Sequence, residues 1–238
     1  MSASRREVLE AVSALCAAAV CACAKAATLD EGAARKARSI ALLRAKGISY
    51  LQGLPQLETS AEVHLRSQDE IIQRSVCLFG VALAAADNDL ESARKVLGAW
   101  GADLSLSPNE RRFLAARPLP EAARADFSWR FEAVVPLLWA LGWLEALPFP
   151  SVPVDPQSLK QLFDAGPGRN PTRLRDVGDI LDQTDLIYRL DWALVEVRVG
   201  RPAKVPDLNP DVVPERHRAL NWLIRYGDED WDDVTADT

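Results

Sequence analysis

The sequence predicts an all-α fold for this chain of 238 residues, and three observations support that prediction. Alanine and leucine outnumber the β-branched residues that strands prefer. No Asn-Gly or Asp-Gly turn separates alternating apolar runs. In the stretch Asp126–Leu147, apolar residues occupy every face of a helical wheel, which is typical of a helix surrounded by other helices. We therefore expect a single multi-helix globular domain over residues 1–238.

Composition and charge exclude several classes of protein. The net charge of −6 and the pI near 5.1 argue against nucleic-acid binding, which requires a basic face. The uncharged runs, such as Ala11–Ala24 and Ala133–Leu144, fall short of the roughly 18 residues that a membrane span needs. The four cysteines form no Cys-x-x-Cys pair, so we expect buried, reduced thiols, at Cys16, Cys21, Cys23 and Cys77.

Residues 1–30 allow two interpretations, an extra N-terminal helix or an export signal. Ser4-Arg5-Arg6-Glu7 before an alanine-rich stretch resembles a twin-arginine signal, although Glu7 and Glu10 are unusual there. The same four residues also form a capping box, as do Ser67–Glu70. Both segments then run through apolar residues to Ala-Arg-Lys, which indicates an approximate helical-hairpin repeat in the N-terminal half. The repeat favours the helix and a cytoplasmic protein over export.

Local signals predict the helices of the first half in order. We expect helices at about residues 5–25 and 31–46, the second ended by Gly47. The capping box at Ser67 starts a helix over 68–86, and a further helix over 90–100 ends at Gly101. Ser107-Pro108-Asn109-Glu110 combines an N-cap, a proline at the first helical position and a capping glutamate. It predicts a short helix that ends near residue 117.

The second half centres on a helix over about 121–147. Pro136 removes a backbone donor, so a kink or a break is expected there. Asp155-Pro156 predicts a short helix to about 163, and the longest helix is expected over 172–199, packed against the central one. The last helix should run from about 210 or 214 to 226. In the acidic tail that follows, Trp231 and Val234 are spaced to dock one turn onto the body.

The motifs of catalytic and metal sites are missing from the sequence. Gly166-Pro-Gly168 lacks the Gly-Lys-Ser/Thr ending of a nucleotide loop, and there is no Gly-x-Ser-x-Gly elbow. The two histidines, His64 and His217, fit surface or packing positions. Four aspartates at Asp176, Asp179, Asp182 and Asp185 suggest a metal site, but the first and last lie on opposite faces of a helix. We predict no catalytic residue, metal or cofactor.

Charged residues next to apolar stretches are the strongest site candidates. Arg66, Glu70 and Arg74 share one helix face, and Arg130 and Glu132 open the central helix. If several such charges converge, they form either a buried ion network or a polar pocket lined by tryptophans. The candidates for binding are Trp129, Arg130, Glu132, Arg66, Glu70, Asp185, Trp192 and Arg216; Arg175 and Glu215 belong to the same charged set.

An ordered set of motifs resembles the bacterial "domain of unknown function 4272" family. The set covers about residues 34–238. It comprises Arg66-Ser-x-x-Glu70-Ile-x-x-Arg74, Leu106-Ser-Pro-x-Glu110-x-x-Phe113-Leu114, Trp129-Arg130-x-Glu132, Leu138-Trp139-Ala-Leu-Gly142, Asp185-Leu-x-Tyr188-Arg-x-x-Trp192, Glu215-Arg216-x-x-Ala219-Leu-x-Trp222 and Trp231-Asp232-x-Val234-x-x-Asp237-Thr238. The resemblance implies a helical domain with a docked tail, and it supplies no activity, cofactor or catalytic residue.

Three functional hypotheses remain. The first is a non-enzymatic protein-binding or adaptor module, which fits the acidic charge and the missing catalytic motifs. The second is a small-molecule or enzymatic site near Trp129, Arg130 and Glu132. The third is an immunity-type protein that neutralises a basic toxin. The sequence leaves the oligomeric state open.

Overall fold

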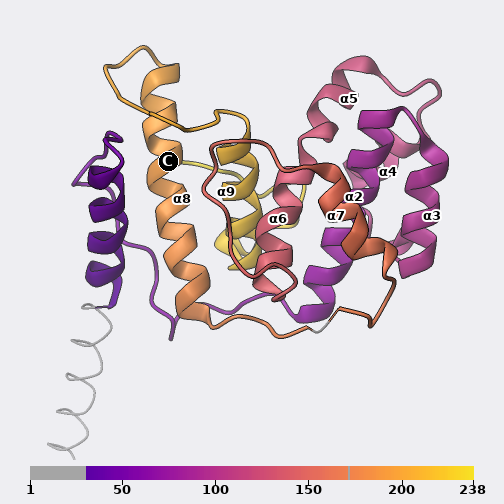
Figure 1. Ribbon diagram of the computed structural model, residues 1–238, viewed down its shortest axis with the longest axis horizontal. Helices are drawn as coiled ribbons and strands as arrows, with labels where there is room; N and C mark the ends of the chain where they lie inside the picture. Colours follow the sequence, from indigo (N-terminus) through magenta and orange to yellow (C-terminus); the bar gives the residue numbers. More distant parts are fainter. Residues whose placement is uncertain (1–30, 171) are drawn as a thin grey trace, which may run out of the picture.

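We describe the fold from a computed structural model, in which residues 31–170 and 172–238 are described (Figure 1). Over these residues the chain is all-helical and forms one globular domain, as predicted. A helix at residues 31–45 stands beside α8 at the left of Figure 1. The other elements are α2 (Gln68–Asp87), α3 (Leu90–Trp100), η1 (Asp103–Ser105), α4 (Pro108–Ala115), α5 (Glu121–Ser128), α6 (Arg130–Ala140), α7 (Pro156–Asp164), α8 (Val177–Arg198), α9 (Val212–Leu223) and η2 (Tyr226–Asp228).

Local capping signals set the helix ends in the first half. At the starts of α2 and α4, Ser67 and Ser107 form capping boxes with Glu70 and Glu110, as predicted. Asp89 caps α3, and Gly101 ends it in the left-handed region. The repeat and the choice between helix and export signal depend on residues 1–30, which lie outside the described residues. Both stay predictions.

The central helix differs from the prediction in where it is interrupted and where it ends. The interruption lies at Trp129, between α5 and α6, whereas α6 continues through Pro136. Of the kink or break predicted at Pro136, the break is therefore wrong, and the kink stays a prediction. The helix also stops at Ala140 rather than near residue 147. Gly142 turns the chain with a φ of +76°, and a Cβ there would lie 3.0 Å from the carbonyl oxygen of Arg173.

The segment before α8 explains why that helix starts later than predicted. The backbone N–H groups of Arg173 and Arg175 donate to the carbonyls of Leu141 and Ala140, at 3.1 and 2.9 Å. Because this extended segment satisfies the carbonyl end of α6, helix formation is delayed to Val177. The predicted packing of the longest helix on the central one is also wrong, since α9 lies between α6 and α8 (Figure 1).

The core is built around α2, α6 and α9. Helix α2 packs against α3, α5 and α6, and α6 packs against α9. The acidic tail after η2 docks as predicted, with Trp231 and Val234 only 4% and 3% exposed. Two side chains of α9 hold it: Arg218 donates to the carbonyl of Trp231, and Asn221 donates to that of Thr235. Among the described helices, none is long and apolar enough to cross a membrane.

Candidate functional site

A groove of about 550 Å3 opens where the first turns of α2 and α4 face the tail. We call it the α2–α4 groove. Its floor is lined by Arg74 of α2 and by Arg66, which precedes the N-cap of that helix, together with Trp222 of α9 and Trp231 of the tail. These residues lie far apart in the sequence, so only the packing of α2, α9 and the tail creates the groove.

The two arginines of the floor are buried and stacked on the two indoles. The Cζ atom of Arg66 lies 4.9 Å from the ring centroid of Trp222, and that of Arg74 lies 5.3 Å from the centroid of Trp231. Arg66 also donates to the carbonyl of Glu229 at 2.6 Å. Arg74 forms a buried ion pair with Glu110. The floor is therefore rigid and internally neutralised.

The first turns of both helices already have their own carboxylate partners. Glu70 accepts from the backbone N–H of Ser67 at 2.8 Å, and Glu110 accepts from that of Ser107 at 2.7 Å. Asp232 of the tail accepts from the backbone N–H of Asn109 at 2.9 Å. Carboxylates of the chain itself therefore neutralise the positive N-terminal ends of both helix dipoles, so these helix ends do not require an external anion.

The rim of the groove carries unpaired negative charge. Asp69, Asp230 and Asp233 are exposed and form no ion pair with a described residue. Arg111 is an exposed cation on the same rim. The pKa of Glu70 is lowered overall. Burial raises it, but the hydrogen bonds from Ser67 and the charges of Arg225 and Arg66 together lower it by more, so this carboxylate is charged as well. The mouth of the groove is acidic above a neutral floor.

Of the eight predicted binding residues, only Arg66 and Glu70 line this groove. Glu132 is buried and uses both oxygens, one for the N–H of Val154 and one for the guanidinium of Arg216. Asp185 forms a fully buried pair with Arg189, at 2.6 Å. These two pairs are ion pairs of the core, the structural alternative that the sequence left open.

The remaining predicted residues lie elsewhere. Arg130 pairs with Glu215 across the contact between α6 and α9. Trp129 and Trp192 are half-buried, and Arg175 donates to three carbonyls near the end of α6. The structure thus disperses these candidates instead of gathering them into one pocket.

Sequence reasoning did not connect Trp222, Trp231 or Asp69 with a site. A signal was present, because four motifs of the family resemblance meet at the groove. They are the motif at Arg66–Arg74, the start of the motif at Leu106, and the tryptophans of the last two motifs. What was missing was the position of the tail, which no local pattern specifies.

The histidine, cysteine and aspartate candidates have packing roles. His217 is buried, with Nδ1 at 2.8 Å from Asp191 Oδ2 and Nε2 at 3.3 Å from Asn221. Cys77 is a free, buried thiol whose pKa burial raises to about 12. Asp182 pairs with Arg35 and Arg38. Over the part of the chain that the structure describes, no group of histidine, cysteine and carboxylate side chains is arranged to hold a metal ion.

Over the described residues, the protein is a single all-helical domain whose α2–α4 groove has an acidic rim. The chain belongs to the family described as "Domain of unknown function (DUF4272)", whose model matches residues 35–234. This confirms the resemblance that the ordered motifs indicated. No curated protein and no solved structure matches the chain.

Proposed function

We propose that this protein is a non-enzymatic protein-binding module that takes a basic segment of another protein into the α2–α4 groove. The observation that carries the proposal is the rim: three exposed aspartates without ion-pair partners among the described residues surround a groove of about 550 Å3. The buried carboxylates of the described residues are paired, whereas those of the rim are exposed beside a concave surface, where a partner can reach them.

Charge complementarity supports a basic partner over an acidic one. The net charge of −6 attracts cations over long range, and the rim concentrates negative charge at the mouth of the groove. Lysine and arginine also carry apolar stems, which can lie along the edges of Trp222 and Trp231. Single exposed ion pairs contribute only about 0.2–1 kcal/mol, so we expect a transient, salt-sensitive complex.

The test uses the full chain and a fluorescently labelled peptide rich in lysine and arginine. Its affinity is measured by anisotropy at low and at physiological salt. The triple variant Asp69→Asn, Asp230→Asn, Asp233→Asn should bind about tenfold more weakly, since three rim contacts are removed. The matched control changes three exposed aspartates away from the groove, Asp87→Asn, Asp179→Asn and Asp211→Asn. It alters the net charge equally and should stay close to the parent.

Equal losses in both triple variants would show that only net charge is sensed, and the proposal would then be wrong. A glutamate-rich peptide that binds as well as the basic one would also contradict it.

Two other hypotheses have less support. An immunity-type protein is the special case in which the basic segment belongs to a toxin, and it requires a toxin gene beside this one. A small-molecule or enzymatic site at Trp129, Arg130 and Glu132 loses Glu132, because both of its oxygens are occupied. We also propose a cytoplasmic location, with export as the alternative if residues 1–30 act as a signal.

A further inference from the structure

A second cavity lies on the other side of the tail. It measures about 430 Å3, and Trp231 and Asp232 separate it from the α2–α4 groove, since both residues line both spaces. Residues of α4 and α5, the start of α6 and the middle of α9 line it, and it is open to solvent; we call it the α4–α5 cavity. A volume of this size is in the range of small-molecule sites.

Two half-buried arginines line this cavity, and only one of them is paired with a carboxylate. Arg130 pairs with Glu215, which lies three residues before Arg218 on the same face of α9. Arg218 forms no ion pair with a described residue and has one hydrogen bond, to the carbonyl of Trp231 at 2.5 Å. Burial lowers the pKa of Arg218 and the positive charge of Arg130 lowers it further, whereas the carboxylates of Glu215, Asp232 and Glu110 act in the opposite direction. Three arginines, with Arg112, line the cavity against the carboxylates of Asp126 and Asp232, and Arg218 is the half-buried one without a direct ion pair among the described residues.

The unused hydrogen-bonding groups of this cluster are accessible. Nη2 of Arg130 and Nη1 of Arg218 bond to no described residue and are not enclosed. The enclosed atoms of this cluster that lack a partner are Nε of both arginines and Oε2 of Glu215. Arg175 is different. It also has no carboxylate partner among the described residues, but its guanidinium group donates to three backbone carbonyls, and it lines neither the α2–α4 groove nor the α4–α5 cavity.

Aromatic rings orient both guanidinium groups. Arg218 lies over Trp231, with Cζ 4.7 Å from the ring centroid, and Arg130 lies 5.6 Å from that of Phe127. Phe127 in turn stacks on Phe113, with centroids 4.4 Å apart. Stacking leaves the N–H edges of a guanidinium free to bind a carboxylate with two hydrogen bonds. The same rings provide an apolar wall.

We propose that the α4–α5 cavity binds a small aromatic carboxylate, whose carboxylate group contacts Arg218 and Arg130 and whose ring lies against Phe127 and its neighbours. The carboxylate completes an alternating chain of charges from Glu215 through both arginines. The site does not depend on the proposed function, because it lies on the opposite side of the tail from the α2–α4 groove.

Calorimetric titration of the full chain with benzoate tests the site. Benzamide (the ring without the charge), acetate (the charge without the ring) and benzylamine (the opposite charge) are the comparison ligands. Benzoate should bind saturably and at least about tenfold more tightly than each of them. Its affinity should fall with added salt, since an ion pair is formed.

Three variants locate the binding. Arg218→Gln should weaken benzoate binding at least about tenfold, and Arg218→Lys should weaken it less, because the charge remains but the fork is lost. Ala123→Leu adds bulk to the cavity wall without changing charge and should also reduce binding. Arg111→Gln removes a cation from the groove instead, so it should leave the benzoate affinity within about twofold.

Circular dichroism and a thermal melt of each variant establish that the fold is retained. If benzoate shows no saturable binding, or if Arg218→Gln and Ala123→Leu both bind like the parent, the proposal is wrong. Equal binding of benzoate and acetate would overturn the aromatic specificity.

Discussion

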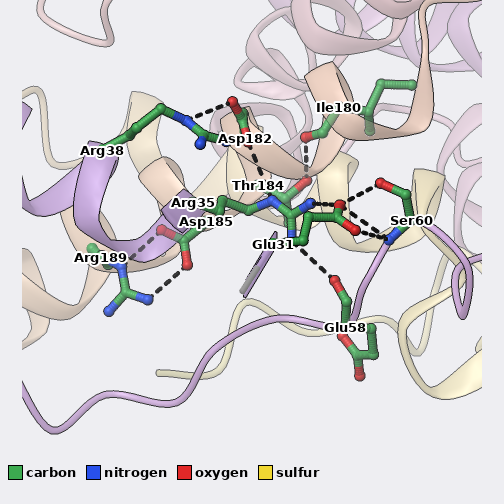
Figure 2. A network of polar contacts seen from close by, with 10 residues as sticks. All are labelled: Glu31, Arg35, Arg38, Glu58, Ser60, Ile180, Asp182, Thr184, Asp185 and Arg189. Atoms are coloured by element: carbon green, nitrogen blue, oxygen red, sulfur yellow. Dashed lines mark hydrogen bonds and ion pairs between the residues drawn. The ribbon is translucent and has the colours of Figure 1, made fainter. Parts of the chain in front are cut away.

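Two charged regions of this molecule use the same residue types in opposite ways. Where the helix at residues 31–45 meets α8, carboxylates and arginines form a continuous network (Figure 2). Glu31 pairs with Arg35 and accepts from Ser60, and Asp182 receives both Arg35 and Arg38. Below them the Asp185–Arg189 pair is fully buried, and Arg189 also donates to the carbonyl of Pro55.

The floor of the α2–α4 groove also contains a buried ion pair, whereas its rim carries carboxylates without one. Arg74 and Glu110 are buried as a pair, whereas Asp69, Asp230 and Asp233 stand in solvent without ion-pair partners among the described residues. The difference follows from desolvation. A charge that is buried loses its hydration and needs a charged or hydrogen-bonding partner within the protein, whereas an exposed charge is solvated by water and needs none. The network joins the helix at residues 31–45 to α8, whereas the rim keeps its charges in solvent, as the proposed function requires.

The largest effect should come from breaking the buried pair of the network. Asp185→Ala leaves Arg189 charged and enclosed, so we expect it to lower the free energy of unfolding by about 3–5 kcal/mol, measured by urea denaturation. Asp179→Ala, an exposed change on the same helix, should alter it by no more than about 0.5 kcal/mol.

Replacing both partners sharpens this test. The double variant Asp185→Leu, Arg189→Met removes both charges, so it should recover most of the loss. If the double variant is as unstable as the single one, the cost does not come from an uncompensated charge.

The next largest effect concerns the tail that separates the two cavities. Trp231→Ala should destabilise the chain by about 3 kcal/mol, because it removes a buried indole and its contacts with Arg74 and Arg218. Hydrogen exchange at residues 229–238 should rise more than exchange in α6. Uniform loss of protection over the whole chain would mean that the tail is part of the cooperative core.

Acid should weaken the network at its exposed end by a smaller amount. Hydrogen bonds from Ser60 lower the pKa of Glu31, with a further contribution from Arg35. A lowered folded-state pKa stabilises the fold above the ordinary glutamate value of about 4.3, and this stabilisation is lost as pH falls below it.

The measurement is urea unfolding of the parent and of Glu31→Gln at pH 7 and near pH 3. The parent should be more stable by no more than about 1 kcal/mol at pH 7, since Glu31 is partly exposed, and the gap should shrink in acid. Glu121→Gln, an exposed first-turn change in α5, is the control and should show a smaller dependence on pH. A gap that widens in acid would contradict the assignment.

The smallest effect on stability is expected at the rim. The variant Asp69→Asn, Asp230→Asn, Asp233→Asn should change the unfolding free energy by about 0.5 kcal/mol or less, because these groups lose no ion pair. A loss above about 2 kcal/mol would show that the rim is structural, and the comparison between the two regions would then fail.

Predictions from sequence succeeded where a structure depends on neighbouring residues. The capping boxes at Ser67 and Ser107 and the end of α3 at Gly101 are interactions within a few residues, so they can be read from the sequence. The interruption at Trp129 and the late start of α8 could not be predicted in this way. The second depends on Arg173 and Arg175 bonding to the end of α6, more than 30 residues earlier in the chain.

The candidate site shows the same division more sharply. The sequence by itself determined the helical class, the family, the capped helices and the presence of charges at apolar stretches. It could not determine which charges would be buried in pairs, because burial depends on how α9 and the tail pack against α2 and α6. Tertiary structure therefore decided that Glu132 and Asp185 are buried in ion pairs. It also decided that Asp69, Asp230 and Asp233 line a groove without an ion pair to any described residue, and that Arg218 lines a cavity.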